Sequence, residues 1–416
     1  MLALAQPCLG TLILHTSDLA QLTILSSHAG NPDLRSQFKV QSFTILLLPL
    51  SAYWTTMGLK DTLPWTMSPL IINAPMGGIA TADLAIAVTK AGGLGQIGGV
   101  PDYEDLLKQL AQAESALDRT SNGLLPIGVG ILSFLMKQED TLPILEKYRP
   151  AVVWLFASHN TSDYSEWAKS IRERLPSSQL WIQIGSVEGA VRIAKEAKPD
   201  VLCLQGIDAG GHGFEKGAGI VSLVPETIDA LKAEGLDKKV SIVAAGGIAD
   251  GRAVAAALTL GAEGVVMGTR FLSAPETKVH PQYREAIIHA KDGGQSTVRD
   301  KVFDELRGPN QWPGDYDGRS IRTASYRDKA EGVHIDEIRQ RHADVARSES
   351  AGYAANGASG RAATWAGTGV GLVTKEQRAA DIVEEVRQQA LASLEAVKAR
   401  FKILPADDQT LHSLMS

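Results

Sequence analysis

Eight short apolar segments, separated by longer amphipathic stretches, follow one another between residues 70 and 269. Parallel strands buried on both faces read as short apolar runs, and each needs a crossover helix before the next strand. The predicted strands are LIINA (70–74), GLGQI (93–97), PIGVGI (126–131), AVVWLF (151–156), LWIQIG (180–185), DVLCLQG (200–206), VSIVAAGG (240–247) and EGVVMGT (263–269). Eight such repeats predict an α/β fold, a closed (β/α)8 TIM barrel.

The structural alternative is an open, doubly wound sheet. Such a sheet usually carries a GxGxxG turn after its first strand, where it binds a dinucleotide. The first predicted strand is instead followed through NAPMGGIATADLA, which lacks that pattern. The barrel is therefore favoured.

The segments around the repeats predict three regions. We expect residues 1–65 to be a poorly ordered N-terminal extension, because they lack periodicity, and Met57 begins a segment typical of the start of a cytosolic barrel enzyme. Residues 66–280 and 361–402 are predicted to form the barrel, closed by an amphipathic helix whose charges mark a solvated face. Residues 281–360, where the alternation stops, are predicted to be helices and polar loops forming a lid over the barrel mouth.

Charge and composition indicate an enzyme that acts on a small molecule. The chain has 416 residues and a net charge of −6, which argues against nucleic acid or an anionic membrane as partner. It contains no apolar run of the roughly 20 residues needed to span a bilayer. The first basic residue is Arg35, so no targeting pattern fits well. Cys8 and Cys203 suggest neither a disulfide nor a metal site. We expect a cytoplasmic protein and leave a homodimer open.

Two glycine motifs follow the last two predicted strands, where TIM barrels commonly bind phosphate. They are AAGGIADG, with Gly246 and Gly247, and MGTRF, with Gly268 and Thr269. Glycines let a backbone approach a phosphate closely, with N–H groups at the start of the following helix as donors. A tight strand-to-helix turn explains either motif alone, but two in consecutive units favour a phosphate site.

The sequence LQGIDAGGHGFEKGAG follows the sixth predicted strand. This glycine-rich loop is expected to expose His212 at the barrel mouth, with little around it to bury against. An imidazole there can abstract a proton near neutral pH or stabilise an anion. His159, after the fourth strand, is a second candidate, although local hydrogen bonding in a loop explains it as well.

The motifs INAPMGG, LQGIDAGGHGFEKG, AAGGIADG and GVVMGTRF, in this order, resemble the nitronate monooxygenase family, formerly called 2-nitropropane dioxygenases. The resemblance covers residues 68–280 and 365–395 and implies an FMN enzyme on a TIM barrel. It implies contacts to the flavin ring from Ala74, Pro75 and Met76, to the cofactor from Gln205 and Gly210, and to the ribityl phosphate from Ala245, Gly246, Gly247, Gly268 and Thr269. Gln183, like Gln205, is a polar residue in an apolar strand and needs a hydrogen-bonding partner, which a flavin edge supplies.

The same resemblance implies that His212 is the catalytic base for nitroalkanes, which react with dioxygen to carbonyl compounds and nitrite; preformed nitronates need no base. Two residues depart from the family pattern: Asp208 replaces a frequent Glu, and Gly130 replaces an Asn that can bond the flavin. These departures predict a chain closer to fungal members. Two other functions stay open, an NAD(P)H-dependent FMN reductase similar to enoyl reductases and a non-catalytic barrel that binds a flavin or phosphate ligand.

Overall fold

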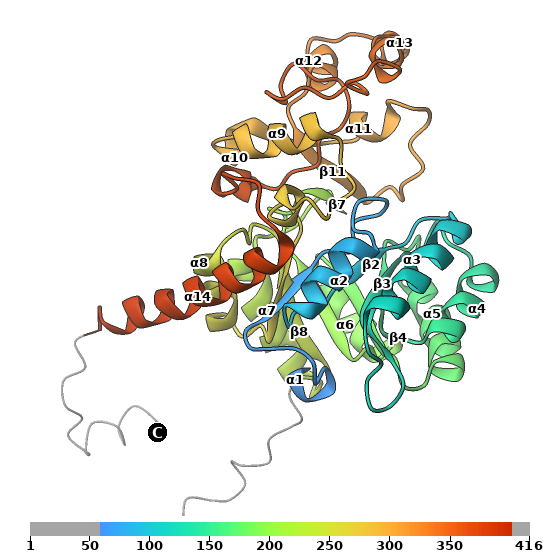
Figure 1. Ribbon diagram of the computed structural model, residues 1–416, viewed down its shortest axis with the longest axis vertical. Coiled ribbons are helices and arrows are strands. Elements are labelled where there is room, and N and C mark those ends of the chain that lie inside the picture. Colours follow the sequence, from blue (N-terminus) through green and yellow to red (C-terminus); the bar gives the residue numbers. More distant parts are fainter. Residues whose placement is uncertain (1–58, 402–416) are drawn as a thin grey trace, which may run out of the picture. The chain divides into compact units, whose positions relative to one another are not determined.

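The computed structural model describes residues 59–401, so most of the predicted extension 1–65 lies outside the described residues. Eight parallel strands form one sheet (Figure 1). They are β1 (Leu70–Asn73), β2 (Gln96–Gly98), β3 (Leu125–Leu132), β4 (Pro150–Phe156), β5 (Gln179–Ile184), β6 (Val201–Gln205), β8 (Ser241–Ala245) and β9 (Gly264–Met267). β1 pairs with β9, and a parallel bridge from Ile72 to Leu94 joins β1 to the segment entering β2. The predicted TIM barrel is thus confirmed.

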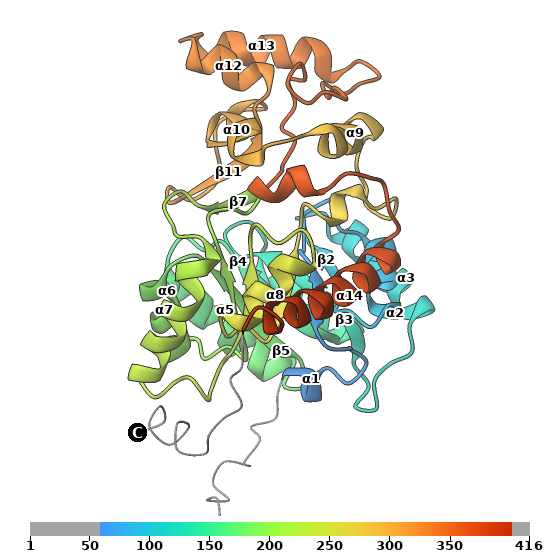
Figure 2. The same cartoon turned by 90° about the vertical axis from the view of Figure 1, so that its left-hand side faces the viewer.

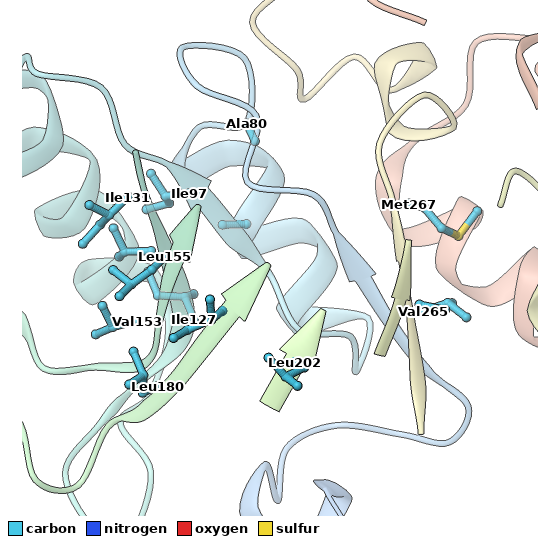
Figure 3. Close-up of a cluster of buried hydrophobic side chains, with 14 of the residues drawn as sticks. Ala80, Ile97, Ile127, Ile131, Val153, Leu155, Leu180, Leu202, Val265 and Met267 are labelled. Atoms are coloured by element: carbon cyan, nitrogen blue, oxygen red, sulfur yellow. The ribbon is translucent and has the colours of Figure 1, made fainter. Parts of the chain in front are cut away.

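Helices surround this sheet because alternate strand residues project outward into an apolar layer. Ile127, Val153 and Leu180 belong to this layer and point away from the barrel axis (Figure 3). Burying each such side chain stabilises the fold by about 1.5–3 kcal/mol. The covering helices are α2 (Ala82–Lys90), α3 (Tyr103–Ala116), α4 (Gln138–Tyr148), α5 (Thr161–Arg174), α6 (Val187–Glu196), α7 (Ile220–Ala233), α8 (Gly251–Thr259) and α14 (Ala379–Lys398).

The barrel interior is filled from its N-terminal end. The short helix α1 (Leu59–Thr62) lies at this end, where Leu59 and Leu63 are buried in the same cluster as Trp154 and Trp181. The two tryptophan rings pack 5.6 Å apart. Residues 59–65 therefore belong to the barrel, whose boundary lies further toward the N-terminus than residue 66.

At the C-terminal end of the barrel interior, neighbouring groups of strands carry side chains of different size. Because Ile97, Val129 and Val265 face outward, the alternation of side chains turns the positions next to them inward. Five neighbouring strands place small residues toward the C-terminal end of the interior, namely Ala74, Gly98, Gly130, Ala245 and Gly268, and among these strands only β3 adds a large one, Leu132. The remaining strands carry Phe156, Gln183 and Gln205 at this level. This asymmetry leaves space for a ligand on one side of the mouth.

The closing helix α14 is held by a buried cation. Arg387 is buried and donates hydrogen bonds to the carbonyl oxygens of Ala91 at 2.6 Å, of Gly92, and of Met67 and Pro69 at 3.4 Å. The expectation that the charges of this helix mark only a solvated face was therefore wrong. The apolar pattern identified the buried face, but it gave no sign that a cation would satisfy carbonyl groups there.

Residues 281–360 contain more than the helices and loops that the sequence predicted. Their helices are α9 (Pro281–His289), α10 (Gly293–Ser296), α11 (Val302–Glu305), α12 (Ala324–Ala330) and α13 (Ile335–Ala346). Two strands, β10 (Thr297–Asp300) and β11 (Tyr316–Ile321), pair antiparallel, and β11 also pairs with β7 (Gly211–Phe214) from the loop after β6. This second sheet lies between the barrel and α12 and α13 (Figure 2). It joins the predicted catalytic loop to the insertion.

Among the helices of residues 59–401, none combines the length and apolar character that a membrane span requires.

Candidate active site

A cavity of about 320 Å³ opens at the C-terminal ends of the barrel strands. Its size and position are those of a small-molecule site in a TIM barrel. His212 and every residue predicted to contact the cofactor line it: Ala74, Pro75, Met76, Gln183, Gln205, Gly210, His212, Ala245, Gly246, Gly247, Gly268 and Thr269. The topology thus brings together residues that are nearly 200 positions apart in the chain.

One end of the cavity is a cradle of backbone groups. Gly246 and Gly247 have φ values of +102° and +74°, a region that favours glycine. A Cβ atom on Gly246 would lie 2.7 Å from the carbonyl oxygen of Gly206. Within the described residues, the N–H groups of Gly247, Ile248 and Thr269 donate to no protein acceptor. Unpaired amides at a concave site are suited to an anion such as a phosphate.

The sequence suggested that N–H groups at the start of the following helix would be the phosphate donors, but in the structure these groups have partners. The Asp250 carboxylate accepts from the N–H groups of Arg252 and Ala253 at the N-terminus of α8, and Gln389 Oε1 accepts from Gly251 N at 3.1 Å. These amides are therefore already occupied. The loop before the helix, rather than the helix itself, offers the free N–H groups.

Residues 367–369 also border the cradle, beside the loops at 246–248 and 268–269. The sequence analysis did not assign them to the site. Gly367 N donates to Thr269 Oγ1 at 3.0 Å, and both the N–H and the hydroxyl of Thr368 bond to Asp208, each at 3.0 Å. Gly210 packs so closely on Gly367 that a Cβ atom at residue 210 would not fit. The glycine-rich WAGTGVGLV at 365–373 was the available signal.

The loop after β1 explains the departure at Gly130. A Cβ atom at this position would collide with the ring of Pro75, which folds inward over the mouth. Met76 follows, and its sulfur lies within 3.8 Å of the place where a side chain at Gly268 would begin. The absence of a side chain at residue 130 thus allows the loop after β1 to line the cavity.

Each of the two predicted glutamines has one of its two side-chain polar atoms hydrogen-bonded within the protein. Gln183 Oε1 accepts from Trp154 Nε1 at 3.1 Å, and Gln205 Nε2 donates to the carbonyl oxygen of His212 at 2.9 Å. In the part of the chain that the structure describes, Gln183 Nε2 and Gln205 Oε1 have no protein partner, and both side chains line the cavity. They offer one donor and one acceptor to a ligand, which fits the polar edge of a flavin.

The sequence suggested that His212 is exposed on a glycine-rich loop, but in the structure it is packed against neighbours. Its ring stacks on Trp312 with 3.7 Å between centroids and an angle of 7°, and Trp365 lies 4.7 Å away. Its Nε2 atom lies 2.6 Å from Asp304 Oδ1, and only 14% of the side chain is exposed. The glycines around His212 therefore admit neighbours from the insertion rather than solvent.

His159 is an exposed residue and does not line the cavity. Its ring meets the edge of Phe134 with 6.0 Å between centroids. The structure thus shows a local ring contact for His159 and no position in the cavity lining; local hydrogen bonding in the loop stays a prediction.

Apart from His212, the lining carries little charge. No lysine or arginine within residues 59–401 lines the cavity. Tyr283, which does line it, donates to the carbonyl oxygen of Trp365 at 3.1 Å, and burial raises the pKa of its hydroxyl, so it stays protonated. On the second sheet, Arg299 Nε pairs with Asp317 Oδ1 at 2.6 Å, and burial lowers the pKa of Arg319 beside them. A flat, uncharged ring with a phosphate at one end fits such a cavity.

Comparison with known proteins places these features in a family. A model described as nitronate monooxygenase matches residues 62–175 and 169–389. A nitronate monooxygenase of Metarhizium robertsii, npaC, is 42% identical over 350 residues, which are 82% of this chain and 96% of that protein. One of Neurospora crassa is 40% identical over 364 residues, 82% of this chain and 94% of that protein. Both organisms are fungi.

The fold is also similar to that of a solved structure. FabK from Thermotoga maritima superposes with a TM-score of 0.65 at 26% sequence identity, covering 82% of this chain and 98% of that one.

Proposed function

The chain belongs to the nitronate monooxygenase family, and from this premise we propose that it is an FMN-dependent oxidoreductase that converts alkyl nitronates, and neutral nitroalkanes, to carbonyl compounds and nitrite with dioxygen. The observation that carries the proposal is the position of His212. Its imidazole, hydrogen-bonded to Asp304, lines the same cavity as the amide cradle at Gly247.

The cofactor is assigned to the barrel side of the cavity. The free amides of Gly247, Ile248 and Thr269 would hold its phosphate, and Gln183 and Gln205 would bond the edge of its ring. When bound, FMN would supply the redox chemistry between the nitronate and dioxygen. The protein supplies orientation and an enclosed, largely apolar environment.

Proton abstraction by His212 is needed only when the substrate is a neutral nitroalkane. With Nε2 held by Asp304, Nδ1 is the ring nitrogen left to accept the α-proton. The C–H bond breaks, an N–H bond forms at Nδ1, and the electron pair moves onto the nitro group. A preformed nitronate has already lost that proton, so the substrate then needs only to be bound and oriented.

The test is a flavin spectrum of the purified protein followed by oxygen uptake with nitroethane and with its nitronate. We expect bound flavin and turnover of both compounds without NAD(P)H. Rapid anaerobic bleaching of the flavin by NADPH, with no turnover of the nitronate, would instead identify a reductase similar to enoyl reductases. Bound flavin without either reaction would identify a non-catalytic binding barrel.

A further inference from the structure

Asp304 is the residue of the insertion that hydrogen-bonds the proposed catalytic base, His212. It lies on the one-turn helix α11, 92 residues after His212. Its side chain is only 7% exposed, and its Oδ1 atom bonds His212 Nε2 at 2.6 Å. Its other oxygen, Oδ2, is buried and has no partner among the described residues. A carboxylate buried with one oxygen unsatisfied costs stability, so its place needs a reason beyond packing.

The aromatic neighbours fix the plane of the imidazole, but they do not decide which ring atoms face Asp304. Stacking on Trp312 at 3.7 Å holds the ring parallel to the indole. A rotation of 180° about the Cβ–Cγ bond keeps that plane and the stacking contact, but it puts Cε1 in the place of Nε2 and Cδ2 in the place of Nδ1. The bond to Asp304 distinguishes the two orientations, because an ionised carboxylate only accepts and therefore selects the tautomer with the proton on Nε2.

We propose that Asp304 is a positioning residue for proton abstraction by His212, an inference that rests on the proposed function. It directs Nδ1, with its lone pair, to the substrate. When Nδ1 takes the α-proton, His212 becomes an imidazolium, and the Nε2–H bond to the carboxylate becomes charge-assisted and stronger. Asp304 stays ionised throughout, and the proton remains on His212 until it is released to solvent.

The contacts of α11 separate this role from a purely structural one. The helix is anchored by Phe303, which is buried and packs against Trp365, and by Val302 N, which donates to Asp300 Oδ1 at 2.7 Å. Neither contact uses the Asp304 carboxylate. Removing its charge should therefore leave α11 in place while changing the environment of the imidazole.

The test compares the wild-type enzyme with Asp304→Asn, loaded with flavin, on nitroethane and on ethyl nitronate. We expect kcat/KM for nitroethane to fall roughly 100-fold, because tautomer selection and imidazolium stabilisation are lost. The value for the nitronate should stay within about twofold, because no proton is abstracted from it. Asp336→Asn, which removes an exposed carboxylate from the same insertion, should change neither value.

Equal losses on both substrates, or no loss on nitroethane, would overturn the role of Asp304. If Asp304→Asn does not retain flavin, Asp304→Glu is measured with the same two substrates; it keeps the charge but moves it, and again only the nitroethane value should fall. A wild-type enzyme inactive on the nitronate would contradict the proposed function itself, so the two failures are distinguishable. Slower nitroethane turnover with a larger isotope effect for α-deuterated substrate would further support the positioning role.

Discussion

The barrel and the insertion build opposite halves of one cavity from different materials. On the barrel side, the cradle consists of backbone amides and missing side chains at Gly246, Gly247 and Gly268. On the insertion side, Asp304 and Trp312 act through their side chains on one imidazole. Under the proposed function, the repeating architecture would bind the cofactor, and the irregular segment would provide the environment of the reacting group. Changes on the two sides should have different consequences.

The largest effect is expected on the barrel side. Gly246→Ala places a Cβ atom 2.7 Å from the carbonyl oxygen of Gly206 at a φ of +102°, so the cradle must open. We expect the purified variant to lose its flavin and at least about 99% of its activity on every substrate, because cofactor binding precedes all chemistry. Flavin absorbance and oxygen uptake measure both effects.

The control for that variant is Gly332→Ala, which has the same kind of backbone strain outside the site. Gly332 has a φ of +85°, and no heavy atom of the described residues lies within 4 Å of an added Cβ. The strain costs about 1–2 kcal/mol of stability, but flavin and activity should be retained. Equal flavin loss in both variants would show that strain, not the cradle, is responsible.

A smaller effect is expected on the insertion side. Trp312→Ala removes the ring on which His212 stacks and should lower nitroethane turnover about tenfold or more, because a reacting group displaced by about 1 Å loses much of its efficiency. Flavin content should not change. Trp312→Phe keeps an aromatic face and should recover most of the rate; a Phe variant as slow as the Ala variant would argue against stacking as the cause.

The smallest catalytic effect is expected for a change outside the site, at Arg387 of the closing helix α14. Arg387→Met keeps the length of the side chain but removes the donor to the carbonyl oxygens of Ala91, Met67 and Pro69, and leaves that of Gly92 with the Met67 N–H alone. We expect the free energy of unfolding to fall by about 2–4 kcal/mol, because each unsatisfied buried group costs about 1–3 kcal/mol. Activity at 25 °C should be unchanged. Arg252→Met, at a side chain that is 71% exposed, should change stability by less than about 1 kcal/mol.

The same contrast explains what could be predicted from the sequence. The barrel strands were predicted because each unit repeats one pattern, apolar strand and amphipathic helix, and the cavity-lining glycines sit at fixed places in it. The strands β10 and β11 were missed because TVRD and YDGRSI carry charged residues in place of an apolar alternation. Arg299 and Asp317 are buried only because they pair with each other across that sheet.

The surroundings of His212 were beyond prediction for a related reason. GHGF reads as a glycine-rich loop, and it becomes the strand β7 only because β11, about 100 residues later, pairs with it. The contact with Asp304 has the same origin. No local pattern marks this residue, because its proposed role depends on a neighbour brought close by the fold of the insertion.

The central claim is that His212 abstracts a proton in a cavity where flavin does the redox chemistry. The most direct measurement is the ratio of kcat/KM for nitroethane to that for ethyl nitronate in flavin-loaded His212→Asn. We predict a fall of about 10²–10⁴-fold for nitroethane and a change of less than about threefold for the nitronate. An equal loss on both substrates, with flavin still bound, would contradict proton abstraction by His212.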